Sequence, residues 1–167
     1  MTVEAFTEAD AGWLRRAFRG AAAARARGDR PFAAVVVDGS GAMLAEAGST
    51  QGASGDGTLA HSEMNVLGAV IRAGVRRDRL GGATIYSSGE PCAMCAAAIF
   101  YSGIGRVVYG LSAGAILALR NARPETAGLT LGCREVLLRA HAPPHVLGPC
   151  LENEGAEPHR GYWTEGA

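Results

Sequence analysis

Residues 85–111 read IYSSGEPCAMCAAAIFYSGIGRVVYGL and give the strongest indication of how this chain folds. The segments on either side of the cysteines, 82–88 and 105–111, are short and rich in β-branched and aromatic side chains, which predicts two strands. The segment between them, 92–103, is rich in alanine and follows a proline. Proline suits a helix start, where its missing N–H would be unpaired anyway, so a helix is predicted. A strand, a helix and a second strand in succession are typical of a layered α/β protein.

The same alternation of strands and helices continues on both sides of this segment. Apolar side chains recur at helical spacing near the N-terminus and again after His61. Two apolar runs that flank a Gly-Ser-Gly turn predict a hairpin. The further elements expected are helices at 4–27, 61–73, 112–120 and 133–141 and strands at 32–38, 42–48 and 145–149. The whole pattern predicts an α/β layer around a mixed sheet.

Composition narrows the class of protein. A chain of 167 residues is long enough for one domain with its own core. We expect a single domain over residues 1–167, in which 150–167 form an acidic tail that is aromatic near its end. Sixteen basic residues, all arginine, balance sixteen acidic ones, which disfavours nucleic acid as a partner. The sequence has no secretory signal and no apolar run of about eighteen residues, so we expect no membrane partner, a cytoplasmic location and reduced cysteines.

Two short motifs bring potential metal ligands and a carboxylate into this pattern. His61 and Glu63 open one expected helix, and Cys92 opens another, with Cys95 one turn later. Cysteines three residues apart share a helix face. Zinc takes thiolate and imidazole ligands, and a catalytic zinc site has three protein ligands and a water. We therefore expect Zn²⁺ on His61, Cys92 and Cys95, with Glu63 beside the water as the general acid and base.

Each motif alone has a simpler interpretation. A Cys-x-x-Cys pair also occurs in redox sites and as half of a structural zinc site, and a single His-x-Glu is common in ordinary helices. A structural zinc site needs a fourth ligand, but the two remaining cysteines, Cys133 and Cys150, stand at no ligand spacing. The joint occurrence of both motifs, each at a helix start and separated by one strand, therefore favours a catalytic site.

The pattern His-x-Glu … Pro-Cys-x-x-Cys is the signature of zinc-dependent nucleobase deaminases. Together with PFAAVVVD at 31–38, AHSEMN at 60–65 and the 85–111 segment, it makes residues 10–112 resemble one branch of the cytidine deaminase-like superfamily. That branch contains guanine deaminases and tRNA adenosine deaminases. The resemblance implies a three-layer α/β/α sandwich around a five-stranded mixed sheet, and a homodimer. It also implies the same three zinc ligands and the same glutamate in proton transfer.

The resemblance also indicates where a substrate binds. Phe32, in the family's Pro-Phe turn, is expected to line the base pocket, although it is equally compatible with an ordinary core position. Glu90 is expected either to hold a loop or to contact the base. In guanine deaminase-like relatives the C-terminal segment can close over an active site, sometimes the partner's, and here Tyr162 and Trp163 are the residues expected to do so.

Two positions depart from the family pattern. The family's Asn, which hydrogen-bonds the base eleven residues before the zinc histidine, is Thr50 here. A hydroxyl offers one hydrogen bond where an amide offers a paired donor and acceptor. Gly57 stands where the family has Asp, and a shift of one residue in the loop would place Asp56 in that role. Both departures concern the identity of the substrate and leave the reaction type unchanged.

The sequence as a whole predicts hydrolytic deamination of a free nucleobase or nucleoside, a small heterocycle from which ammonia is released. A guanine-type aminopurine is favoured, because the motifs and the HRGYW segment at 159–163 are most similar to that branch. The alternatives are a cytosine-type pyrimidine deaminase, a tRNA adenosine deaminase that forms inosine, and a fold that zinc stabilises without catalysis. The acidic tail disfavours the tRNA alternative.

Overall fold

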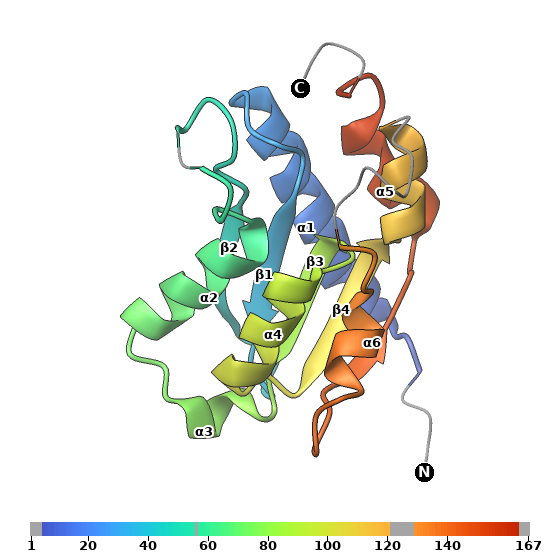
Figure 1. Cartoon of the computed structure of the whole chain (residues 1–167). Helices are drawn as coiled ribbons and strands as arrows, with labels where there is room; N and C mark the ends of the chain where they lie inside the picture. The colour runs from blue at the N-terminus through green and yellow to red at the C-terminus, as the bar shows by residue number, and fades with distance from the viewer. Residues whose placement is uncertain (1–4, 56, 121–128, 164–167) are drawn as a thin grey trace.

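The computed structural model describes residues 5–55, 57–120 and 129–163 (Figure 1). Its strands are β1 (Ala33–Val37), β2 (Met43–Gly48), β3 (Thr84–Gly89), β4 (Arg106–Leu111) and β5 (His145–Leu147). They form one five-stranded sheet in the order β2-β1-β3-β4-β5. β1 pairs antiparallel with β2 and β3, whereas β3 with β4 and β4 with β5 are parallel pairs. The five-stranded mixed sheet confirms the expected fold class.

Helices cover both faces of this sheet (Figure 1). On one face lie α1 (Glu8–Ala26) and α7 (Glu152–Ala156), and on the other lie α2 (Ser62–Arg72), α4 (Ala93–Ser102) and α6 (Cys133–Leu137). The connecting segments contain α3 (Arg77–Leu80) and α5 (Ala113–Leu119). This arrangement is the three-layer α/β/α sandwich that the sequence predicts. No helix in the described ranges is long and apolar enough to cross a membrane.

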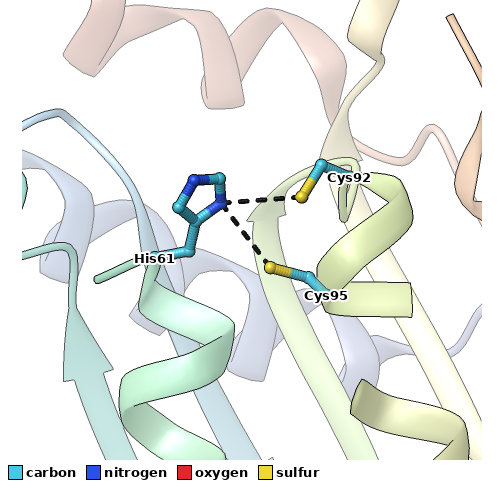
Figure 2. Close-up of side chains that lie close together, drawn as sticks. All are labelled: His61, Cys92 and Cys95. Carbon is cyan, nitrogen blue, oxygen red and sulfur yellow. Dashed lines mark hydrogen bonds between the residues drawn. The ribbon is translucent and has the colours of Figure 1, made fainter. Parts of the chain in front are cut away.

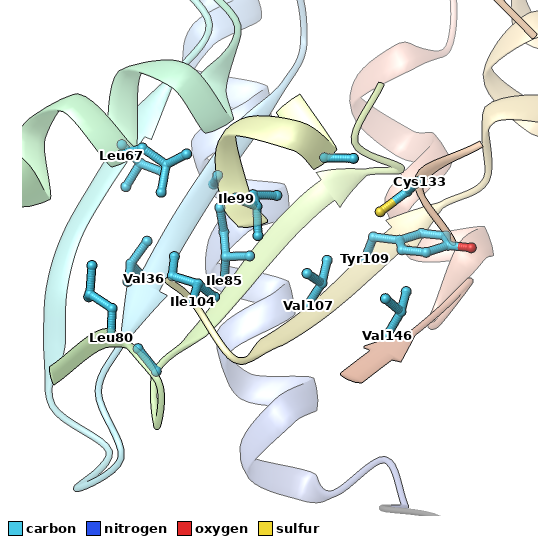
Figure 3. Close-up of a cluster of buried hydrophobic side chains, with 14 of the residues drawn as sticks. Val36, Leu67, Leu80, Ile85, Ile99, Ile104, Val107, Tyr109, Cys133 and Val146 are labelled. Atoms are coloured by element: carbon cyan, nitrogen blue, oxygen red, sulfur yellow. The ribbon is translucent and has the colours of Figure 1, made fainter. Parts of the chain in front are cut away.

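The interior strand β1 contributes to two core clusters, one on each face of the sheet. Alternate side chains of a strand point to opposite faces of a sheet. Val36 belongs to the cluster under α2 and α4, together with Leu67 and Ile99 (Figure 3). Its neighbour Val35 belongs to the cluster under α1, together with Leu14. Both faces of β1 are therefore buried away from solvent, which explains why its sequence is continuously apolar.

Three short helical segments were missed by the sequence analysis, and one expected helix is shorter than predicted. These missed segments are α3, α7 and a 3₁₀ turn at Glu157–His159. Elements of three to five residues are too short to show a helical period. The helix expected at 133–141 ends at Leu137, because the residues that follow do not continue its buried apolar stripe. The next residue, Leu138, is exposed.

Four chain segments meet at the end of the sheet where β3 stops. Because β1 runs antiparallel to β3, with Ala34 opposite Ser87, the residue before β1 lies at the same end as the residue after β3. These residues are Phe32 and Glu90. The first turns of α2 and α4 begin at this end of the sheet (Figure 1). In open α/β sheets, the crevice outside the carboxyl ends of the strands is where ligands bind.

Candidate active site

Three side chains, His61, Cys92 and Cys95, point toward one another at this end of the sheet (Figure 2). Nδ1 of His61 lies 3.7 Å from Sγ of Cys92 and 3.5 Å from Sγ of Cys95. All three ligand atoms lie within 4.8 Å of one another. Tetrahedral zinc, with Zn–N of about 2.1 Å and Zn–S of about 2.3 Å, holds an imidazole nitrogen and a thiolate ~3.6 Å apart. The donor atoms and their spacing therefore fit zinc.

The local backbone explains why these side chains are free to bind a metal. His61 is the N-cap residue of α2 and Cys92 is the N-cap residue of α4. Neither side chain accepts a capping hydrogen bond from its own helix. Cys95 follows one turn into α4, and its side chain is fully buried. The two helix starts thus present their ligands to each other across the gap between α2 and α4 (Figure 2).

The two thiols differ in their tendency to ionise. A hydrogen bond with Cys95, reinforced by His61, lowers the pKa of the Cys92 thiol to about 4. The same hydrogen bond, followed by burial and the charge of Glu63, raises the pKa of Cys95 above its usual range. Cys92 in turn raises the pKa of His61. The pair therefore holds one sulfur as a thiolate, which is the form that binds zinc.

Glu63 lies in the first turn of α2 and is 5% exposed. Its Oε1 accepts a hydrogen bond from the Ser87 hydroxyl at 2.8 Å, and its Oε2 accepts one from the Ser62 hydroxyl at 3.1 Å. The thiol of Cys95 lies 3.7 Å from the same Oε2. The carboxylate is therefore held in one orientation beside the metal ligands, where it can exchange protons with a water.

A cavity of about 190 Å³ adjoins the metal ligands. Its apolar walls include Phe32, Ile116, Leu117, Leu129 and Trp163, and His61, Glu63 and Cys92 also line it. The ring centroids of Phe32 and Trp163 lie 6.3 Å apart. Aromatic walls beside a few fixed polar groups suit a flat heterocyclic ligand.

The C-terminal segment supplies one wall of this cavity. Nε1 of Trp163 donates a hydrogen bond to Nδ1 of His159 at 3.3 Å, and the His159 ring meets Phe32 edge to face at 4.9 Å. His159 is 1% exposed, and burial lowers its pKa to about 4, so its ring stays neutral and Nδ1 can accept this bond. The segment thus places Trp163 on the cavity of its own chain.

Glu90 lines the cavity, but both of its carboxylate oxygens have backbone partners. Oε2 accepts a hydrogen bond from the N–H of Ala113 at 3.0 Å, and Oε1 accepts one from the N–H of Cys133 at 3.1 Å. Glu90 therefore joins the starts of α5 and α6 to the end of β3. Its contact with a substrate stays a prediction.

The loop after β2 places its side chains differently from the expectation. The Thr50 hydroxyl accepts a hydrogen bond from the Asn65 amide, and Thr50 is not among the described residues that line the cavity. Gly57 also lies away from the cavity, and Asp56 is outside the described residues. The substrate role of Thr50 stays a prediction. The neighbouring Gln51 does line the cavity.

Sequence reasoning missed four polar residues of the cavity: Arg30, Gln51, Ser62 and Arg120. Gln51 had one visible signal, because it is an amide next to the position where the family carries an amide. Arg30 and Arg120 belong to no motif. Arg120 is brought to the cavity by the direction in which α5 runs, which the sequence pattern does not predict.

Comparison with known proteins agrees with this geometry. Residues 7–111 match the model of the family described as the cytidine and deoxycytidylate deaminase zinc-binding region. That range contains both motifs, and so the three metal-ligand candidates and Glu63.

Whole-chain similarity extends beyond the matched region. A Schizosaccharomyces pombe protein named "Probable cytosine deaminase" is 37% identical over 166 residues, which cover 99% of each chain. A tRNA-specific adenosine deaminase of Agrobacterium fabrum is 33% identical over 146 residues, covering 85% of this chain and 88% of that one. A solved guanine deaminase from Nitrosomonas europaea superposes with a TM-score of 0.68 at 22% identity, covering 96% of this chain and 86% of the other.

Proposed function

Because this chain belongs to the family of cytidine and deoxycytidylate deaminases, and so is a zinc-dependent hydrolase that releases an amino group, we propose that it deaminates a free nucleobase or nucleoside. A guanine-type aminopurine is the first candidate. The observation that carries the proposal is that Phe32, Trp163 and Glu63 share one small cavity with His61 and Cys92. A flat ring that stacks on the aromatic walls would present its amino group to the carboxylate and the metal.

The net reaction adds water to the ring carbon that bears the amine and breaks the exocyclic C–N bond, leaving a carbonyl and ammonia. Zinc, when bound by His61, Cys92 and Cys95, lowers the pKa of water and so supplies a nucleophile at neutral pH. Glu63 accepts the proton that the water loses and delivers protons to the ring nitrogen and to the departing amine. Ser62 and Ser87 keep the carboxylate in place for these transfers.

Cytosine is the second candidate, and one specific observation favours it. The S. pombe relative named for cytosine is similar over 99% of both chains, so the similarity includes the C-terminal segment that walls the cavity. In both guanine and cytosine the amino group lies next to a ring nitrogen, and this nitrogen is the atom that Glu63 would protonate. The cavity walls accept either ring by stacking.

Ammonia release from a panel of guanine, guanosine, cytosine, cytidine and adenine tests the proposal. Turnover of one of these, lost in Glu63→Gln, is the expected result. Inosine formation in a tRNA anticodon stem-loop, with all free bases and nucleosides inert, would show that the chain edits tRNA instead.

We extend the proposal to assembly and location. Ile71 of α2, Tyr101 of α4 and Leu138 directly after α6 are 61%, 74% and 66% exposed, and the three helices cover the same face of the sheet. Exposed apolar side chains gathered on one face are typical of a protein interface, so we propose a homodimer through this layer. A mass from light scattering that equals one chain would contradict it. We also propose a reducing, cytoplasmic setting, because Cys92 and Cys95 bind zinc only when reduced.

A further inference from the structure

Two arginine side chains line the cavity, and they come from distant parts of the chain. Arg30 precedes β1, and Arg120 follows α5. Within residues 5–55, 57–120 and 129–163, neither guanidinium has an ion-pair partner. Seven of the thirteen other described arginines, Arg15 and Arg16 among them, do have such partners. The cavity therefore holds two cationic side chains that form no ion pair with a carboxylate of the described residues.

The two carboxylates of the cavity are occupied elsewhere. Glu63 is held by the hydroxyls of Ser62 and Ser87, and Glu90 accepts hydrogen bonds from two backbone N–H groups. Burial, and then the charge of Arg30, lower the pKa of Arg120. Both arginines line the same cavity, so an anion bound there would interact favourably with each of them.

The Arg120 side chain is also oriented by an aromatic wall. Its guanidinium carbon lies 4.9 Å from the centre of the Trp163 ring, in a cation–π contact. Trp163 is fixed in turn by its hydrogen bond to His159. A planar guanidinium held in this way can offer paired N–H donors to a carboxylate or a phosphate.

We propose that the cavity accepts an aminated heterocycle that carries one anionic group, a carboxylate or a phosphate, and that Arg30 and Arg120 bind this group. The inference rests on the proposed deaminase function and shifts its substrate from a neutral base or nucleoside to an anionic derivative of one. The zero net charge of the whole chain gives no sign of it, because the two cations are a local feature. A cavity of about 190 Å³, lined by two arginines among the described residues, favours a small anionic ring over a polynucleotide, whose backbone needs several cations.

Matched pairs of ligands test the proposal by binding as well as by turnover. Two pairs have no amino group to release and so bind without reacting: uracil against uracil-5-carboxylate, and uridine against uridine 5′-monophosphate. Titration calorimetry measures the Kd of each compound. Turnover is measured with three further pairs, which are cytosine against cytosine-5-carboxylate, cytidine against its 5′-monophosphate, and guanosine against its 5′-monophosphate. The carboxylate pairs and the phosphate pairs distinguish the two sources of charge.

The anionic member of at least one pair should bind about 10- to 100-fold more tightly, the difference expected for a charge-assisted hydrogen bond of about 1.5–3 kcal/mol. Arg30→Gln and Arg120→Gln should each remove most of this preference, and Arg120→Lys should keep part of it. The exposed Arg139, which does not line the cavity, serves as the matched control: Arg139→Gln should keep the full preference.

Equal binding of the neutral and anionic members in every pair would overturn the inference. It would also be overturned if the two arginine variants weakened the binding of the neutral and the anionic member to the same extent. Tight binding of a tRNA stem-loop that depends on Arg30 and Arg120, with weak binding of every small anion, would also overturn it. Absence of ammonia from all heterocycles, with the anionic preference intact, would overturn the deaminase proposal and leave the anion site standing.

Discussion

The side-chain amide of Asn65 donates a hydrogen bond to the hydroxyl of Thr50 over 3.1 Å. The same amide also donates to the carbonyl of Gly48, so Asn65 ties the loop after β2 to the first turn of α2. Thr50 is thereby turned toward α2, and the next residue, Gln51, lines the cavity. Within the described residues, the side chain of Gln51 makes one hydrogen bond, of 3.3 Å from its Nε2 to the carbonyl of Thr58 in an exposed loop.

The first prediction concerns which residue of this loop contacts the substrate, and the lining of the cavity favours Gln51 over Thr50. Gln51→Ala should raise KM by roughly 10-fold, since one hydrogen bond is lost. Thr50→Val removes a hydroxyl that bonds only within the protein, so it should lower the free energy of unfolding by about 1 kcal/mol and leave KM nearly unchanged. Steady-state kinetics and urea unfolding of both variants separate the two roles. A KM effect in Thr50→Val alone would show that the loop binds substrate in another register.

The second prediction concerns the metal. The purified protein should contain about one zinc per chain, because three protein ligands and a water complete the shell. His61→Ala and Cys92→Ala should lose the metal, as measured by mass spectrometry of the dissolved sample. Cys150 lies in the cluster under α1, away from the ligands, so Cys150→Ala should keep full occupancy. Full zinc content in both ligand variants would mean that the metal binds elsewhere.

The third prediction separates metal binding from catalysis. Glu63→Gln should keep zinc and the fold, because the amide oxygen can still accept from Ser87. It should lower kcat by about 10²–10⁴-fold, the usual contribution of a general acid or base. The exposed Glu8 at the start of α1 serves as control, and Glu8→Gln should retain normal turnover. Turnover near normal in Glu63→Gln would exclude the proton transfer role.

The fourth prediction concerns a buried ion pair far from the cavity. Asp10 is 3% exposed and lies 2.6 Å from the Arg106 guanidinium, and it also accepts a hydrogen bond from Tyr86. Burial alone would raise the pKa of Asp10, but Arg106, Thr7 and Tyr86 more than offset this and hold it below the usual range. Asp10→Asn should therefore lower the free energy of unfolding by about 3 kcal/mol at neutral pH.

The effect of Asp10→Asn should depend on pH in a defined direction. A carboxylate with a lowered pKa stabilises the fold above the unfolded pKa of about 3.9, and that stability is lost as the pH falls further. The difference between wild type and variant should thus shrink below about pH 4. Asp78→Asn removes an exposed ion pair with Arg76 and should change stability by less than about 1 kcal/mol at any pH. A difference for Asp10→Asn that is independent of pH would show that packing, not charge, is responsible.

Most of the fold was predictable because its signals are local. The helical period of α1 and α2, the alanine-rich segment after Pro91 that forms α4, and the apolar runs of β1, β3 and β4 each depend on residues close together in the sequence. The short elements α3 and α7 carried no such signal. Ile71 shows a further limit: the helical period puts it on the apolar stripe of α2, yet the structure leaves it 61% exposed.

By itself the sequence determined the chemistry of the site, because His61, Glu63, Cys92 and Cys95 stand at helix starts whose spacing fixes how ligands share a face. Only the tertiary structure decided what surrounds that chemistry. Arg30, Gln51, Arg120 and Trp163 meet at one cavity although they come from separate segments. Their meeting depends on the direction of each loop and on the hydrogen bonds that orient it, and these arise from packing between distant parts of the chain rather than from any local pattern.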